Sequence, residues 1–161
     1  MAKNPITPTT EPLDVIVRLD ITVAQAQAVA AALDLFTRLS LGQFEEISSK
    51  FAHGEFRVVR HGDEMGRLPT EQECCEIRSL CAGLKRIAGH AHGGSFGIGS
   101  VAVSEKAHAS YEVMKVLNET LALHRDPAPS FRGVDYDGLT VRYSTQPAPR
   151  CAMEDKGMRH A

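Results

Sequence analysis

Residues 13–41 read LDVIVRLDITVAQAQAVAAALDLFTRLSL, and this stretch decides the predicted fold. Between residues 13 and 20 apolar residues recur at nearly every second position, which is typical of a strand. Thr22 and Gln25 then match the Thr-x-x-Gln capping box that opens many helices. From residue 24 to 41 the chain is rich in Ala and Leu, which favours a helix. We therefore expect a sharp change from strand to helix near residue 22.

The helix expected over 24–41 is apolar on more than one face. One stripe contains Ala26, Val29 and Phe36, and a second contains Ala32 and Leu39. A helix that is apolar nearly all round is usually buried. The pattern predicts that this helix is central in the molecule or is buried between subunits.

Further helices are expected on the C-terminal side of this one. Apolar residues recur at helical spacing from 44 to 51, and His53-Gly54 ends that segment. A second capping box, Thr70 to Glu73, opens a helix that runs to about residue 88. Ser104 is the expected N-cap of a long helix that ends near His124.

The remaining segments complete the expected fold class. Residues 56–60 could form a short strand, and residues 139–144 are expected to form a strand that pairs with the first one. Helices and strands that do not alternate as βαβ units predict an α+β fold, in which a small antiparallel sheet packs against about four helices. The expected organisation is a single domain over 12–145 with flexible tails at 1–11 and 146–161.

Length and charge exclude several classes of protein. The chain has 161 residues and a mass of 17.5 kDa, which fits one ordinary domain. Its net charge is −2, so it lacks the overall basic field of a nucleic-acid binder. No apolar run is long enough to span a bilayer and no hydrophobic signal segment is present. We expect a cytoplasmic homo-oligomer, since the small sheet would leave open edges.

The cysteines and histidines do not predict a metal or redox site. Cys74, Cys75 and Cys81 are crowded onto one helix, where neighbours point about 100° apart and do not share an ion readily. They are expected to be small apolar residues of a helix face. His90 and His92 are the best pair should a metal bind. No catalytic residue, metal or cofactor is predicted.

The stretch 90–100, HAHGGSFGIGS, is rich in glycine and lies just before the expected helix at Ser104. Its unhindered backbone N–H groups and the helix N-terminus favour an anionic ligand such as a phosphate. The loop matches neither a Walker motif nor a dinucleotide-binding fingerprint. A plain connection between two helices is the alternative interpretation.

A second cluster lies at 124–144, HRDPAPSFRGVDYDGLTVRYS, where arginine, aromatic and aspartate side chains alternate. Arginines bind phosphates with two hydrogen bonds, aromatic rings stack on bases, and aspartates accept from ribose hydroxyls. Alternatively, the aromatic residues hold the loop to the core while the arginines pair with the aspartates. Both interpretations stay open on the residues alone.

Two blocks of the sequence resemble a family of small proteins of tailed phages and prophages. They are LDLFTRLSLGQFEEI at 33–47, and GSFGIGSVAVSEKAHASYEVMKVL at 94–117 followed by the cluster at 124–144. The family looks similar to the phage anti-defence sponges that act against Thoeris immunity. Those proteins bind cyclic ADP-ribose signals without cleaving them, and some also hold cyclic di- or trinucleotides, within dimers or hexamers.

The resemblance implies a protein that sequesters a cyclic nucleotide immune signal in the host cytoplasm and is not an enzyme. A pocket of this kind needs arginines and aromatic rings but no catalytic acid or metal. The alternatives are a protein inhibitor of a host defence or regulatory factor, and a nucleotide-cleaving phosphodiesterase. The predicted ligand-binding residues are Gly94, Phe96, Gly97, Gly99, Arg125, Phe131, Arg132, Tyr136 and Arg142.

Overall fold

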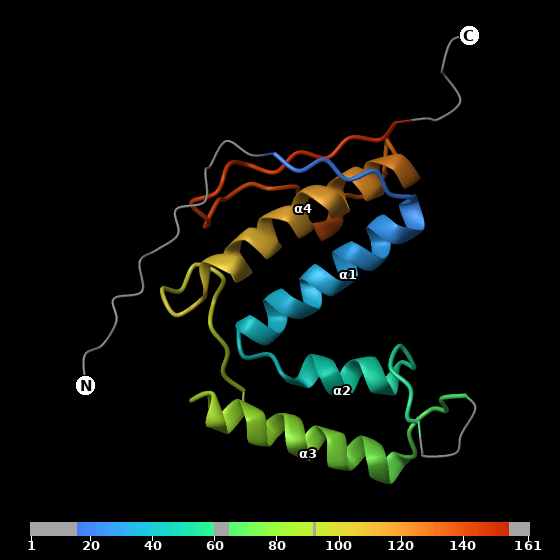
Figure 1. Cartoon of the computed structure of the whole chain (residues 1–161), viewed down its shortest axis with the longest axis vertical. Helices are drawn as coiled ribbons and strands as arrows, with labels where there is room; N and C mark the ends of the chain where they lie inside the picture. The colour runs from blue at the N-terminus through green and yellow to red at the C-terminus, as the bar shows by residue number, and fades with distance from the viewer. Residues whose placement is uncertain (1–15, 60–64, 92, 155–161) are drawn as a thin grey trace.

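The computed structural model describes residues 16–59, 65–91 and 93–154, which form a set of helices joined by irregular segments (Figure 1). The elements are α1 (Val23–Ser40), α2 (Glu45–Ala52), α3 (Glu71–Ile87), α4 (Glu105–Arg125) and a short 3-10 helix, η1 (Val134–Tyr136). No described helix is long and apolar enough to cross a membrane.

Local capping interactions fix where three of the helices begin. In α1 the Thr22 hydroxyl accepts from the Gln25 backbone N–H, and the Gln25 side chain accepts from the Thr22 backbone N–H. Thr70 and Glu73 form the same reciprocal pair at the start of α3. The Ser104 hydroxyl accepts from the Ala107 N–H at the start of α4. These three predicted helix starts are confirmed.

The core lies mainly between α1 and α4. Ala26 and Ala30 of α1 are buried against Leu117 of α4, and the partly buried Leu121 packs on the same cluster. A second cluster, Leu41, Val103 and Ala107, joins the end of α1 to the start of α4. In Figure 1 the helices follow one another in space in the order α4, α1, α2, α3, with α3 at the outer edge of the molecule.

The pair α2 and α3 forms a separate layer beside α1. Nζ of Lys85 donates to both carboxylate oxygens of Glu45 at 3.0 Å, and the Lys85 side chain is only 6% exposed. Cys81 is buried in the same layer, where desolvation raises the pKa of its thiol. Among the described helices α3 contacts only α2.

The predicted antiparallel sheet is wrong, because the described residues contain no strand. An isolated antiparallel bridge between Val58 and Arg67 is what forms near the expected strand at 56–60. Residues 16–20 of the first expected strand are irregular and exposed, and residues 13–15 lie outside the described part. The fold in the described part is therefore helical rather than α+β.

The end of the segment 139–144, which was expected to be a strand, is bound by Glu112 of α4 instead of by a neighbouring strand. One of the Glu112 carboxylate oxygens, Oε1, accepts from the backbone N–H groups of Tyr143 and Ser144 at 2.7 Å, and Oε2 accepts from the Ser144 hydroxyl at 2.8 Å. Glu105, two turns earlier on α4, accepts from the backbone N–H and hydroxyl of Thr145. These backbone N–H groups, which would donate to a neighbouring strand in a sheet, therefore donate to side chains of α4.

The predicted tails are described only in part. The N-terminal tail at 1–11 lies outside the described residues, as does 155–161 of the C-terminal tail. Residues 146–154 of the C-terminal tail carry no helix or strand.

Candidate functional site

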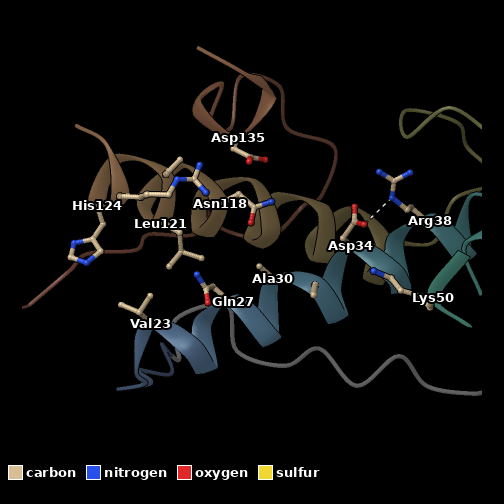
Figure 2. A pocket seen from close by; sticks show the side chains of 13 residues that line it. Val23, Gln27, Ala30, Asp34, Arg38, Lys50, Asn118, Leu121, His124 and Asp135 are labelled. Atoms are coloured by element: carbon tan, nitrogen blue, oxygen red, sulfur yellow. Dashed lines mark hydrogen bonds and ion pairs between the residues drawn. The ribbon is translucent and has the colours of Figure 1, made fainter. Parts of the chain in front are cut away.

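A groove runs between α1 and α4 and has a volume of about 630 Å³. We call it the α1–α4 groove. Figure 2 shows that its lining comes from both helices, with Lys50 of α2 at one end and Asp135 of η1 above it. The lining residues are Val23, Gln27, Ala30, Ala31, Asp34, Arg38, Lys50, Asn118, Leu121, Ala122, His124, Arg125 and Asp135.

One end of the groove is formed by an ion-paired arginine. Nε of Arg38 donates to Asp34 Oδ2 at 2.8 Å, and Nη1 donates to Glu46 Oε1 at 3.1 Å. The hydrogen bond to Asp34 is the main reason why the pKa of Arg38 is raised above its usual value. No described residue accepts a hydrogen bond from Nη2. Arg38 is therefore held in place with one nitrogen left for a ligand.

The opposite end is formed by two side chains from the last turn of α4. His124 and Arg125 line the groove there, and no hydrogen bond or ion pair joins the Arg125 guanidinium to another described residue. Lys50, beside Arg38, donates to both Glu55 carboxylate oxygens at 3.0 and 2.8 Å. The middle of the groove is lined by apolar side chains, by the amides of Gln27 and Asn118, and by the carboxylate of Asp135 above them (Figure 2).

A second, smaller cavity of about 330 Å³ adjoins the groove, and we call it the aromatic pocket. Rings from two segments line it, Phe96 from the glycine-rich loop and Tyr111 from α4. The Phe96 N–H donates to Leu41 O at 2.8 Å, and the Phe96 ring meets His90 edge to face at 4.4 Å between centroids. The full lining is Asp34, Thr37, Arg38, Leu41, Gln43, Phe96, Gly97, Ile98, Tyr111 and Met114.

Thr37 supplies an unusual polar group in the aromatic pocket. The residue is 3% exposed, and its hydroxyl oxygen has no hydrogen-bond partner among the described residues. A buried hydroxyl without a partner costs free energy. Asp34 and Arg38 line both cavities, so the aromatic pocket and the α1–α4 groove meet at this ion pair.

The predicted site residues are divided between these cavities and the surface. Phe96 and Gly97 line the aromatic pocket, and Arg125 lines the α1–α4 groove. Six others line neither of the two cavities. They are Gly94, Gly99, Phe131, Arg132, Tyr136 and Arg142.

Several of these six have local roles in the described structure. The Gly94 N–H donates to Ala91 O, and Gly99 lies close against the ring of Tyr143. Arg142 donates to Gln146 O, and its Nε lies 3.7 Å from Glu112 Oε2, so it helps to hold the C-terminal segment on α4. Phe131 and Arg132 are exposed.

The sequence did not single out Thr37, Arg38 or Tyr111 as ligand-binding residues. Thr37 and Arg38 lie inside the block 33–47 that carries the resemblance, which is the signal that could have identified them. Asn118, a polar residue within the helix expected from Ser104, also lines the groove.

The candidate metal pair is tested only in part, because His92 lies outside the described residues. His90 packs against Phe96, and its ring lies close to Gly42. Within the described part of the chain, no group of three or more His, Cys, Asp or Glu side chains is placed to hold a metal ion.

Comparison with known proteins finds no matching family model, no matching curated protein and no matching solved structure.

Proposed function

We propose that this protein binds a cyclic nucleotide immune signal and holds it without cleaving it. The ligand class is cyclic ADP-ribose isomers or cyclic di- and trinucleotides, and the binding site is the α1–α4 groove with the aromatic pocket. The resemblance of residues 33–47, 94–117 and 124–144 to a family of phage and prophage proteins that looks similar to the anti-defence sponges supports this class. In that role the protein acts in the cytoplasm of the host cell as a homo-oligomer, a dimer or a hexamer.

The observation that carries the proposal is the joining of two unlike cavities at the Asp34–Arg38 pair. The aromatic pocket offers the rings of Phe96 and Tyr111, which suit the stacking faces of a nucleobase. The groove offers cationic side chains at both ends, which suit phosphates. Both volumes fall in the range of small-molecule sites, roughly 300 to 1,000 Å³.

Asp34 positions an arginine where the two cavities meet. This carboxylate borders both cavities, and its Oδ2 accepts a hydrogen bond from Arg38 Nε at 2.8 Å. A carboxylate used in this way orients the guanidinium toward a ligand.

The proposal is tested by mixing purified protein with a panel of cyclic ADP-ribose isomers and cyclic di- and trinucleotides. Free ligand is removed, the protein is heat-denatured, and the released compound is identified by mass spectrometry. We expect release of an intact nucleotide. Release of an altered nucleotide would identify an enzyme, and no bound compound across the panel would favour a protein inhibitor; either result overturns the proposal.

Single substitutions locate the site. We expect Arg125→Ala and Phe96→Ala each to weaken binding about tenfold or more, because a hydrogen bond to a charged group contributes about 1.5–3 kcal/mol and base stacking contributes on a similar scale. Arg150→Ala is the matched control, since Arg150 is exposed and lines neither cavity. Loss of binding in Arg132→Ala but not in Arg125→Ala would place the ligand on the segment after α4 instead of in the groove.

A further inference from the structure

The segment that follows η1 runs beside α4 and is bound to it through backbone groups (Figure 1). Oε1 of Glu112 accepts from the N–H groups of Tyr143 and Ser144, both at 2.7 Å. Oε1 of Glu105 accepts from the N–H and the hydroxyl of Thr145. We call Tyr143, Ser144 and Thr145 the strap. Because Glu112 is buried and bonds to the backbone, it holds the Tyr143 side chain in one place beside the helix.

The Tyr143 ring contacts both α4 and the glycine-rich loop. Its centroid lies 6.0 Å from that of Tyr111 on α4, with the two ring planes at 65°, and 5.9 Å from that of His108. Ring pairs at such separations attract one another. From the loop, a Cβ placed on Gly99 would lie 3.0 Å from Cε1 of Tyr143, so the loop backbone packs directly on the ring. One side chain therefore joins the strap, the helix and the loop.

Both contacts lead to the walls of the aromatic pocket. Tyr111 lines the pocket from α4, and residues 96–98 line it from the loop, immediately before Gly99. Tyr143 lies outside the lining. Its ring therefore contacts one lining residue and the neighbour of another without bordering the cavity. A side chain in this place affects a bound molecule by positioning the walls rather than by touching the molecule.

Glycines make the loop backbone adaptable, so the anchors of the loop matter for the pocket. The Phe96 N–H donates to Leu41 O at 2.8 Å, and the partly buried Ile98 packs on the core cluster at the start of α4. Gly97 and Gly99 add no side chain that could hold the remainder of the loop. A loop that samples several conformations must be ordered on binding, which lowers affinity. Contact with the aromatic ring of the strap reduces that cost.

We propose that Tyr143 is a positioning residue of the aromatic pocket. Glu112 holds its backbone, and its ring holds the loop that carries Phe96 in the conformation that binds the nucleobase. It does so for the pocket of the proposed function, on which this inference rests. The contacts with Gly99 and Tyr111 are made by the ring, so the ring and not the hydroxyl is the part that positions the loop.

Amide hydrogen exchange of the nucleotide-free protein tests the positioning directly. In Tyr143→Ala the Phe96 amide should exchange about threefold faster or more than in the unmodified chain, because the loop loses its contact with the ring. Tyr143→Phe keeps the ring and should behave like the unmodified chain. Val141→Ala, which changes an exposed side chain of the same segment, is the matched control and should leave the Phe96 amide unchanged.

Nucleotide binding provides the second measurement. Equilibrium dialysis with cyclic ADP-ribose and, separately, with cyclic di-AMP should give a dissociation constant about three- to tenfold higher for Tyr143→Ala, as expected for the loss of one aromatic contact. Tyr143→Phe should bind as the unmodified chain does. An unmodified chain that bound neither nucleotide would count against the proposed function alone, and the exchange of the Phe96 amide would still decide whether Tyr143 positions the loop.

A substitution on the loop side tests the same contact with the ring in place. Gly99→Ala brings a methyl group against the Tyr143 ring, so it should also speed exchange of the Phe96 amide and weaken binding. In the Tyr143→Ala background the ring is absent, so adding Gly99→Ala should cause no further loss. Unchanged exchange of the Phe96 amide in either single variant, an equal effect of Tyr143→Phe, or additive effects of the two alanine substitutions would overturn the proposal.

Discussion

At the scale of single residues, Glu112 has the lowest exposure, 1%, of the buried polar and charged residues in the described part of the chain. A buried carboxylate is tolerated when hydrogen bonds replace its hydration. Here both oxygens are used, by two backbone N–H groups, the Ser144 hydroxyl and, at longer range, Arg142. One side chain on α4 therefore determines the course of the segment after η1.

Replacing Glu112 with Ala should lower the free energy of unfolding by about 1–3 kcal/mol, because buried donors lose their acceptor. The segment around Tyr143 should also become more sensitive to protease. Urea denaturation and limited proteolysis measure these effects. Glu154→Ala is the control, because Glu154 is exposed and forms no hydrogen bond or ion pair with a described residue. Equal stability of the two variants would contradict this role.

Acid should weaken the same attachment. Burial alone raises the pKa of Glu112, but the hydrogen bonds from Ser144 and Tyr143 and the charge of Arg142 outweigh it and hold that pKa below its usual value. A carboxyl whose pKa is lower in the folded state stabilises the fold fully above its unfolded pKa, about 4.3. That stability is lost as the pH falls through the lower, folded value.

An NMR titration checks the direction of this shift. The amide signals of Tyr143 and Ser144 should move with a midpoint below about 4.3, the usual glutamate pKa. Ser144→Ala removes one hydrogen bond to the charged form, so it should move the midpoint upward. A midpoint at or above the usual value in the unmodified protein would refute the assignment.

At the scale of elements, the turn between α1 and α2 requires a glycine. Gly42 has a φ of 86°, a left-handed conformation that L side chains rarely adopt. A Cβ there would also lie 2.2 Å from Nε2 of His90. We expect Gly42→Ala to destabilise the protein by roughly 1–3 kcal/mol through strain and displacement of His90.

Thermal denaturation of Gly42→Ala against Gly93→Ala tests this requirement. A Cβ at Gly93 meets no atom within 4 Å, and the residue is exposed, so its substitution should leave the melting temperature nearly unchanged. Similar melting temperatures for the two variants would show that His90 and the backbone adjust without cost.

The sequence predicted the helices better than the strands, because the residues that start a helix are close together in the sequence. Thr22 with Gln25 and Thr70 with Glu73 satisfy each other within one turn, so four residues contain the whole signal. The alternation of apolar and polar residues at 139–144 indicates on which side each side chain lies. It does not indicate which group accepts hydrogen bonds from the backbone N–H groups. That acceptor is Glu112, a distant residue whose part no spacing rule indicates.

The sequence predicted those residues of the candidate site whose side-chain chemistry alone suggests ligand binding. Phe96, Gly97 and Arg125 were chosen for their chemistry and do line cavities. Thr37 and Arg38 look like ordinary positions of an amphipathic helix. Their importance comes from the packing of α1 against α4, a long-range contact that local patterns do not contain.

At the scale of the whole molecule, the α2–α3 pair is joined narrowly to the α1–α4 pair. The links include the short turn at Gly42, a small contact of α1 with α2 that contains the Arg38–Glu46 ion pair, and the packing of His90 on Phe96. Parts of a protein with few buried contacts to the remainder open at a lower free-energy cost than the core does. The α2–α3 pair should therefore open before α1 and α4 separate.

Amide hydrogen exchange measures this order, because buried amides exchange only when the structure around them opens. The amides of α2 and α3 should exchange faster than those of α1 and α4. Equal protection of the two helix pairs would contradict the narrow junction and would mean that the described part of the molecule opens as one unit.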